Sequence, residues 1–560
     1  MSARVVLALA LFVAPVCAQA ERANERDVRL ILSLSIDQMV PEQLDRLAPW
    51  LAGGLGRMLR EGREFTCAEL RYGETETGPG HACIGTALLP ARHGIVANDW
   101  IAIDASRATY CFDDPDARAV TNAGVGTWRA SSPRNFRAEG FAEHLRAASP
   151  SSRIVAISAK DRSAIGMSGR KADLALWWDK RSGGYLTSTW YATELPPWVR
   201  EWNAGWLERL ATGEFGRGWS CQLPERFEGS RTAPDEREGE RGRPGERAFP
   251  HRAPRFEGAL DKDQLAYAAS WVYDGPAGDV LSTDLARLAQ RELGLGERGA
   301  VDLLCLSLSS CDTVGHGYGR DSVEVTDVVL RADRLLAELF EQLDERVGAG
   351  RWIASLTADH GVMELPETLA SRGIDAGRWS TKLLRDAVER ARPRVAARFG
   401  ADFYLAYHSR GVRLSQAAMT EAGVAPSEVR AQYVEELLTA GASWIEHAVS
   451  FDELESVARR GAAPRTALIA LEAASFDEER TCDVVVLWRR NYLFGVAAGS
   501  SHGTPHDYDR AIPLLFYGPG VTAGRSAEPA SSIDVLPTLM SLAGLPVPPG
   551  LDGRVLDVAR

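Results

Sequence analysis

Two stretches decide the fold: Leu303-Leu304-Cys305-Leu306-Ser307-Leu308, followed by Asp312-Thr313-Val314-Gly315-His316, and Trp352-Ile353-Ala354-Ser355-Leu356, followed by Thr357-Ala358-Asp359-His360. Each begins with a short apolar run typical of a buried strand and then places a carboxylate and an imidazole after the strand's end. In an open α/β sheet, ligands and metals bind at the carboxyl ends of the strands. Asp and His together suit zinc, and two such pairs indicate two metals, an arrangement used in phosphoryl chemistry.

The rest of the chain alternates strands and helices in the way that a mostly parallel sheet requires. Further apolar runs predict strands at 28–36, 64–70, 153–157 and 511–517. Helical periodicity predicts a helix from Pro41 through Leu59, a long amphipathic helix over 323–347 and a last helix over 533–542. We therefore predict an α/β fold, with a doubly wound, mostly parallel sheet flanked by helices.

Two segments interrupt this alternation and are predicted to be inserted cap segments. Residues 172–260 are rich in Trp, Gly, Pro and charge, and their part 231–255 is typical of a solvated loop. Residues 380–474 have a mixed, mainly helical pattern. We expect one domain over 21–560 with insertions at about 172–260 and 380–474.

The N-terminus is typical of a secretory signal peptide over residues 1–20. Arg4 supplies positive charge, Val5–Val13 an apolar core, and Ala18-Gln19-Ala20 a small-x-small cleavage site. Nothing later approaches the roughly 18 to 20 apolar residues of a transmembrane helix, so we expect a secreted or periplasmic protein without integral membrane association. The seven cysteines after the signal are odd in number and include no Cys-x-x-Cys pair, which argues against a thiolate zinc site.

The overall charge restricts the partners of this protein. The net charge of −12 and the pI near 5.5 argue against a nucleic-acid surface. An acidic protein that binds an anionic substrate must concentrate positive charge locally, which bound metals would do. The sequence does not determine the oligomeric state.

The motifs, taken in order, resemble those of a known family. They are Asp37, Thr77-Gly78-Pro79-Gly80-His81, Asn98, Lys160-Asp161-Arg162, Asp312 with His316, Asp359-His360, Ser501-His502-Gly503 and the closing Ile533–Leu539. This series resembles the alkaline phosphatase superfamily, and within it the bacterial secreted, phosphate-irrepressible alkaline phosphatases with a threonine nucleophile, relatives of the type I phosphodiesterases and nucleotide pyrophosphatases. The resemblance covers nearly all of the chain after residue 20 and implies an alkaline-phosphatase-like fold.

The resemblance implies two zinc ions, each with three protein ligands and an open position, as in catalytic zinc sites. Ligands of one ion would be Asp312, His316 and His502. Ligands of the other would be Asp37, Asp359 and His360, with the Thr77 hydroxyl completing the shell.

Four residues are expected to act on the substrate, a small-molecule phosphate ester. Thr77 matches the family nucleophile, and its place at a helix start also directs backbone N–H groups at an anion. Asn98 matches an asparagine that donates to a phosphoryl oxygen. Lys160 and Arg162 match a cationic pair that contacts the non-bridging oxygens; on a strand, residues i and i+2 would share a face. His81 and His93 are expected to be structural or to support the ligands, and His506 is not expected to be a ligand.

These matches favour a zinc-dependent phosphomonoesterase that forms a phosphothreonine. The alternative is a phosphodiesterase or nucleotide pyrophosphatase on the same two-metal scaffold, which is expected to lack the Lys-x-Arg pair. A sulfatase would need a Cys-x-Pro-x-Arg context, and a cofactor-independent phosphoglycerate mutase would be cytosolic and use serine. Phosphonate hydrolysis stays open. A non-enzymatic metal-binding or adhesive protein is expected to lose a ligand or the nucleophile, and all are present.

Overall fold

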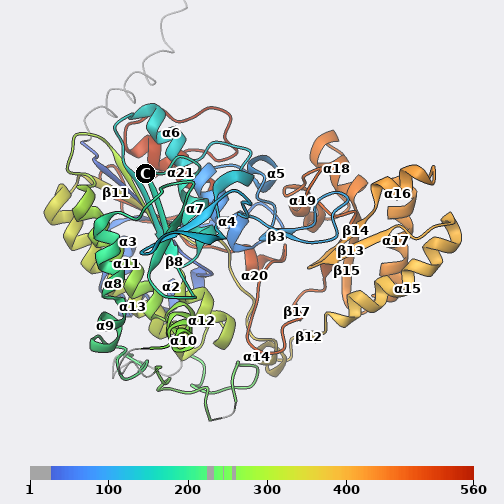
Figure 1. Cartoon of the computed structure of the whole chain (residues 1–560), viewed down its shortest axis with the longest axis horizontal. Coiled ribbons are helices and arrows are strands. Elements are labelled where there is room, and N and C mark those ends of the chain that lie inside the picture. Colours follow the sequence, from blue (N-terminus) through green and yellow to red (C-terminus); the bar gives the residue numbers. More distant parts are fainter. Residues whose placement is uncertain (1–26, 224–231, 244, 255–259, 560) are drawn as a thin grey trace, which may run out of the picture.

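The computed structural model describes residues 27–223, 232–243, 245–254 and 260–559, so the predicted signal peptide lies outside the described residues. An 11-stranded mixed sheet forms the centre of the described chain (Figure 1). Its strands, from one edge to the other, are β19 (Gly524–Ala530), β2 (Arg63–Ala68), β18 (Leu514–Tyr517), β11 (Trp352–Thr357), β1 (Leu30–Ile36), β10 (Asp302–Leu308), β7 (Ile154–Ser158), β8 (Leu174–Trp178), β9 (Tyr185–Ser188), β5 (Arg118–Thr121) and β6 (Gly124–Arg129). The predicted α/β class is confirmed.

The middle of the sheet is parallel and brings the predicted site together. β11, β1, β10, β7 and β8 all run in one direction. Their registers align the carboxyl ends, with Ile36 opposite Leu308, Ser35 opposite Thr357, and Ser307 opposite Ser158. The segments after these strands therefore emerge at one edge. The outer pairs β11–β18 and β8–β9 are antiparallel.

Helices cover both faces of the sheet (Figure 1). One group comprises α3 (Gly54–Glu61), α11 (Ala277–Leu293), α12 (Ser310–Tyr318) and α13 (Val323–Leu343), and the other comprises α4 (Thr77–Thr86), α6 (Phe141–Ala148), α7 (Asp161–Ser168) and α21 (Val535–Leu542). The remaining helices of this body are α2 (Pro41–Leu47), α5 (Pro90–His93), α8 (Pro197–Ala204), α9 (Trp206–Thr212), α10 (Lys262–Asp274), α14 (Pro366–Ser371) and α20 (Asp507–Arg510). In the described part of the chain, no helix has the length and apolarity needed to cross a membrane.

The single helix predicted from Pro41 through Leu59 is wrong, because the structure has two helices there, α2 and α3. The chain turns between α2 and α3 where Gly53 packs closely against α13. A Cβ on Gly53 would lie 2.3 Å from the Asp333 carbonyl oxygen, so only glycine allows this approach. The Asp333 carboxylate then accepts hydrogen bonds from the N–H groups of Gly53 and Gly56, which satisfies the start of α3.

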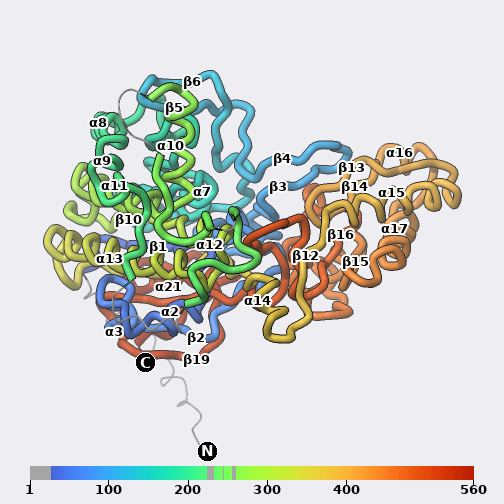
Figure 2. The backbone as a smooth tube through the Cα atoms, turned by 90° about the horizontal axis from the view of Figure 1, so that it is seen from below, coloured from blue at the N-terminus to red at the C-terminus, as the bar shows by residue number. Residues whose placement is uncertain are grey.

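A second unit lies at one end of the molecule (Figures 1 and 2). Its sheet has the order β13 (Tyr404–His408), β14 (Gly411–Leu414), β16 (Val484–Trp488), β15 (Ile445–Ser450), and its helices are α15 (Lys382–Phe399), α16 (Gln416–Glu421), α17 (Pro426–Ala440), α18 (Phe451–Arg460) and α19 (Ala467–Ala473). A hydrophobic core of its own joins α15 and α17 to this sheet.

The structure also locates the edges of the two interrupting segments. β16 pairs between β14 and β15, so the second unit includes residues beyond 474. β8 and β9 belong to the main sheet although they lie within 172–260. Both differences arise because strand pairing joins segments that are distant in sequence, which a local pattern does not record. All seven described cysteines are free thiols.

Candidate active site

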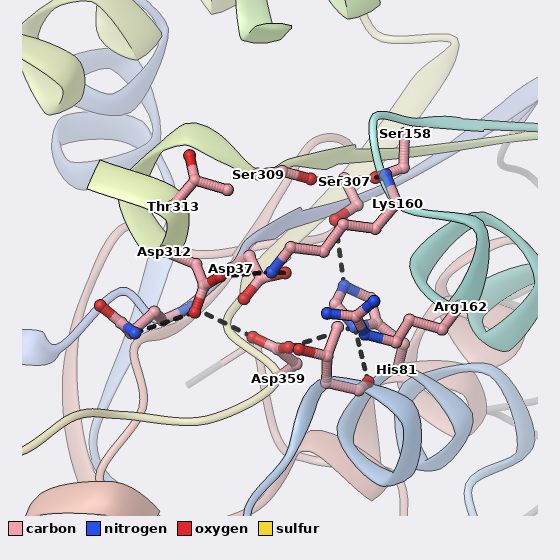
Figure 3. Close-up of polar contacts among 12 residues, drawn as sticks. Asp37, His81, Ser158, Lys160, Arg162, Ser307, Ser309, Asp312, Thr313 and Asp359 are labelled. Carbon is pink, nitrogen blue, oxygen red and sulfur yellow. Dashed lines mark hydrogen bonds and ion pairs between the residues drawn. The ribbon is translucent and has the colours of Figure 1, made fainter. Parts of the chain in front are cut away.

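The carboxyl ends of β1, β10, β11 and β7 place their following residues around one point (Figure 3). Asp37 follows β1 directly, and its N–H donates to the Leu308 carbonyl at the end of β10. Asp312 lies in the first turn of α12, and Asp359 lies two residues after β11. All three carboxylates are buried. The edge of the sheet that the sequence pointed to is thus where the acidic residues gather.

Six of the predicted ligands form two compact triads. Asp312, His316 and His502 make one, and Asp37, Asp359 and His360 make the other. Within each triad, the potential ligand atoms all lie within 4.8 Å of one another. The His360 and His502 rings stack with their centroids 3.6 Å apart, so the two triads adjoin.

The three histidines of the triads are oriented in the same way. Nδ1 of His316 lies 2.8 Å from the Ser500 carbonyl, Nδ1 of His502 lies 2.8 Å from the Thr75 carbonyl, and Nδ1 of His360 lies 3.0 Å from the Gly361 carbonyl. Because a carbonyl oxygen only accepts, each Nδ1 carries the proton and each Nε2 keeps a free lone pair. Histidine ligands of metals are held in this way, by a hydrogen bond from the other ring nitrogen.

Two oxygens of the second triad fit a metal ion. Asp37 Oδ1 and Asp359 Oδ2 are buried and accept no hydrogen bond within the described residues, although Nε2 of His360 lies 3.7 and 3.2 Å away from them. A buried charged oxygen without a hydrogen bond is costly unless a cation compensates it. Together with the free imidazole lone pairs, these oxygens make the triads candidate metal-binding groups.

Lys160 joins the two triads. Its Nζ donates to Asp37 Oδ2 at 2.7 Å and to Asp312 Oδ2 at 2.5 Å, and the side chain is 1% exposed. Burial raises the pKa of Asp37 to about 7, with repulsion from Asp359 in the same direction and the ammonium of Lys160 against it. Gathering three carboxylates at one point thus requires positive charge, and Lys160 supplies part of it.

Thr77 is the first residue of α4 and faces the second triad. Its Oγ1 lies 3.5 Å from Nε2 of His360. The helix packs so closely here that a Cβ on Gly80 would lie 2.3 Å from the Asp359 carbonyl oxygen. The second glycine of the Thr-Gly-Pro-Gly-His motif therefore allows the start of α4 to approach the Asp359 backbone closely.

Asn98 lies beside the start of α4 and its side chain is fixed in orientation. Its Oδ1 accepts a hydrogen bond from the Gly78 N–H at 2.8 Å, and its own N–H donates to Glu76 Oε2 at 2.6 Å. Since the carbonyl end of the amide is bonded to Gly78, the Nδ2 end stays available as a donor. This is the end that the predicted contact with a phosphoryl oxygen needs.

The expectation that Lys160 and Arg162 share a strand face is wrong. β7 ends at Ser158, Lys160 is the N-cap residue of α7, and Arg162 lies in the first turn of that helix. A turn at the end of the strand nevertheless directs both side chains toward the carboxylates (Figure 3). Arg162 Nε is buried and has no hydrogen-bond partner among the described residues, so it can donate to a ligand.

Gln38 is a site residue that the sequence reasoning missed. Its Nε2 donates to Asp312 Oδ1 at 2.8 Å, and its N–H donates to Asp359 Oδ1 at 3.1 Å, so it bridges the two triads. The backbone there has φ = 69°, which is uncommon for a residue other than glycine. Its place next to Asp37 was the only signal, and the positive φ is not readable from the sequence.

The other histidines of the motifs lie outside both triads. His81 Nδ1 is 2.9 Å from the Thr77 carbonyl and 3.2 Å from Asp359 Oδ2, so it lies between the start of α4 and the Asp359 carboxylate. His93 is buried, and burial lowers its pKa to about 3, which keeps it neutral. His506 Nε2 donates to the Trp488 carbonyl at 3.1 Å.

The comparisons with known proteins agree with this geometry. The chain matches the type I phosphodiesterase / nucleotide pyrophosphatase family over residues 31–509. The chain belongs to this family. The matched region includes both triads, Thr77, Asn98, Lys160 and Arg162.

Relatives that match over nearly the whole of both chains are named alkaline phosphatases. The chain is 29% identical to "Alkaline phosphatase PafA" of Elizabethkingia meningoseptica, over 94% of this chain and 93% of that protein. It is 28% identical to "Alkaline phosphatase PhoV" of Synechococcus elongatus, over 94% and 92%. The crystal structure of wild-type PafA superposes with a TM-score of 0.82 at 27% identity, covering 95% of this chain and 99% of that one. The predicted resemblance to bacterial alkaline phosphatases within the type I phosphodiesterase / nucleotide pyrophosphatase family is confirmed, and so is the alkaline-phosphatase-like fold.

Proposed function

We propose that this chain is an exported, zinc-dependent alkaline phosphatase that hydrolyses small-molecule phosphate monoesters through a phosphothreonine at Thr77. The observation that carries the proposal is the placement of Thr77 against one of two adjoining Asp/His triads, with Lys160 and Arg162 directed at the same point. Full-length relatives named alkaline phosphatases support the same activity.

Two zinc ions would be held by the two triads, with Thr77 Oγ1 as a further ligand beside Asp37, Asp359 and His360. When bound, they would supply Lewis-acid stabilisation of the entering and leaving oxygens of an in-line displacement. Three carboxylates against two divalent cations leave a net charge near +1, which favours an incoming phosphate dianion in a protein of net charge −12.

One residue of this chain would attack the substrate, and others would stabilise the transition state. Thr77 Oγ1 forms a bond to phosphorus as the bond to the alcohol oxygen breaks, and the proton lost from the Thr77 hydroxyl is balanced by the one that the leaving alcohol gains. Water then breaks the Oγ1–phosphorus bond, which releases phosphate and restores the Thr77 hydroxyl. Asn98 Nδ2, Arg162 and Lys160 donate to the non-bridging oxygens, on which negative charge is spread in the transition state. The backbone N–H groups at the start of α4 add to this stabilisation.

The alternative function is a phosphodiesterase or nucleotide pyrophosphatase, which the family description names. Lys160 and Arg162 favour the monoesterase, because a dianion can use two cationic contacts and a diester has one charge fewer. The test is kcat/KM for phenyl phosphate against methyl phenyl phosphate with the zinc-loaded protein. We expect the monoester to be preferred by about 10²-fold or more, and a preference for the diester would contradict the proposal.

The two-zinc assignment makes a prediction on metal content. His502→Ala is expected to lower bound zinc from two ions to one per chain and to abolish most phosphate release, because it removes one of three ligands of a triad. The measurement is elemental analysis after dialysis. His506→Ala is the matched control, because His506 lies four residues away and belongs to neither triad; equal zinc loss in both variants would contradict the assignment.

Export is proposed from residues 1–20, which lie outside the described residues. The expectation is a mature N-terminus at Glu21 in protein recovered from the periplasm or medium. An intact Met1 on the active, exported protein would overturn it.

A further inference from the structure

A cavity of about 190 Å³ lies between the second unit and the His502 loop. Its lining includes Glu76, Arg410, Trp488, Tyr492, Phe494 and His502. One end is therefore formed by a triad histidine and by the residue before Thr77, and the other by strands β16 and β17 (Tyr492–Phe494). The cavity adjoins the candidate active site without being part of either triad.

The geometry of the proposed displacement places the leaving alcohol at this cavity. Thr77 Oγ1 lies beside His360, in the triad with Asp37 and Asp359. In an in-line displacement the leaving oxygen departs opposite the entering one, hence on the side of the other triad. His502 belongs to that triad and lines the cavity. The alcohol part of a monoester that is attacked by Thr77 then extends past His502.

We propose that this cavity is a leaving-group subsite, which receives the alcohol part of the substrate and favours a neutral alcohol that carries one aromatic or heteroaromatic ring. The inference rests on the proposed phosphatase function and deepens it. It assigns a substrate class to a surface that is made jointly by the main body and the second unit.

Aromatic side chains of β16 and β17 form part of the cavity wall and are held in place. The Trp488 and Phe494 rings stack in parallel, with centroids 3.9 Å apart and planes at 2°. Tyr492 stacks on Trp379 at 5.1 Å, and its hydroxyl donates to Asp375 Oδ1 at 2.6 Å. Each ring already uses one face on its stacking neighbour, and Tyr492 also lies under Arg489, so ring edges and the remaining faces are what the wall can offer to another ring. Edge-to-face contacts of this kind are favourable for aromatic pairs.

The size of the cavity limits the group to one ring. A cavity of about 150 Å³ holds benzene in a protein interior, so about 190 Å³ accommodates one ring with a small substituent. A second ring would have to remain outside the cavity.

The polar wall selects against further negative charge. Arg410 is buried and already paired, with Nη1 donating to Glu472 Oε1 at 3.0 Å and Nη2 bonded to Glu74. Glu76 and Asp509 also line the cavity. Burial raises the pKa of Asp509 to about 8, so this carboxyl adds little negative charge near neutral pH. The charge of Arg410 is balanced by the carboxylates bonded to it, which leaves Glu76 as the charged group that would repel a second anionic group on the alcohol.

The test measures binding of two non-hydrolysable analogues, benzylphosphonate and ethylphosphonate, in which a methylene stands for the ester oxygen. Calorimetric titration of the zinc-loaded full-length protein needs no turnover. We expect benzylphosphonate to bind roughly three- to tenfold more tightly than ethylphosphonate. A ratio near one in the unmodified protein would overturn the inference.

A matched pair of variants locates the effect. Tyr492→Ala is expected to bring the ratio close to one, whereas Tyr404→Ala should retain it. Tyr404 lies in β13 of the second unit, is half-buried like Tyr492 and also lies under an arginine, but it does not line the cavity. Tyr492→Leu keeps bulk without the ring and should also reduce the ratio, which guards against a folding defect in the alanine variant. Equal ratios in the Tyr492 and Tyr404 variants would overturn the inference.

The outcome is separable from that of the proposed function. Monoester turnover with a ratio near one would refute the subsite alone. Absence of phosphate release from every monoester would refute the phosphatase, whatever the ratio, and the subsite as a leaving-group site with it.

Discussion

Thr77→Ala is expected to lower kcat/KM for a phosphate monoester by about 10³-fold or more, because no other hydroxyl replaces the attacking group. Thr77 Oγ1 lies at the start of α4 and 3.5 Å from His360 Nε2. The measurement is steady-state phosphate release from an aryl phosphate by the zinc-loaded variant.

The matched variant is Thr77→Ser, which keeps the hydroxyl and should retain much of the activity. Zinc content must be measured in both, since Thr77→Ala is expected to keep both triads and hence both ions. Near-normal turnover by Thr77→Ala would refute the nucleophile assignment. Loss of zinc together with activity would mean that Thr77 acts mainly as a ligand.

Joint replacement of Lys160 and Arg162 by alanine is expected to have the next largest effect. We expect kcat/KM for phenyl phosphate to fall by about 10²- to 10⁴-fold, since each removed donor to the transition state typically costs about 10²-fold. The fall for methyl phenyl phosphate should be much smaller, because a monoanion uses the cationic pair less. The measured quantity is the ratio of the two kcat/KM values.

The control replaces Arg170, which is half-buried, and Lys171, which is exposed; both follow α7 at its other end. Their joint change to alanine removes the same charge and should leave the ratio unchanged. Lys160 also bridges Asp37 and Asp312, so zinc content should be measured beside activity. An equal fall for monoester and diester would show that the pair positions ligands and does not discriminate the substrate's charge.

Much of the fold was predictable because buried parallel strands are continuous apolar runs. β1, β10 and β11 were predicted to within two residues at each end. The break between α2 and α3 was not, since it depends on the close approach of Gly53 to α13. A helical pattern continues through this region, and only the packing partner distinguishes one helix from two.

The candidate site was also predictable from the sequence only in part. Asp37 and Asp359 could be located because each follows a strand end closely, where a parallel sheet presents its ligands. Lys160 and Arg162 were named from a motif, but they were expected on a strand and lie instead at the start of α7. The sequence did not show this, because β7 ends where its pairing with β10 and β8 ends.

The sequence by itself determined the α/β class, because strand periodicity is a local property. It also supplied the Asp and His residues that are candidate ligands, from their chemistry and their place after strands, and the candidate threonine, from the family motif alone. The tertiary structure decided how these residues act together. It brought His502 against His360, gave each triad histidine a carbonyl that fixes its tautomer, and placed Gln38 as a bridge. It also closed a cavity between two units. These features depend on distances between segments far apart in the chain, and such distances are set by the packing of the whole core.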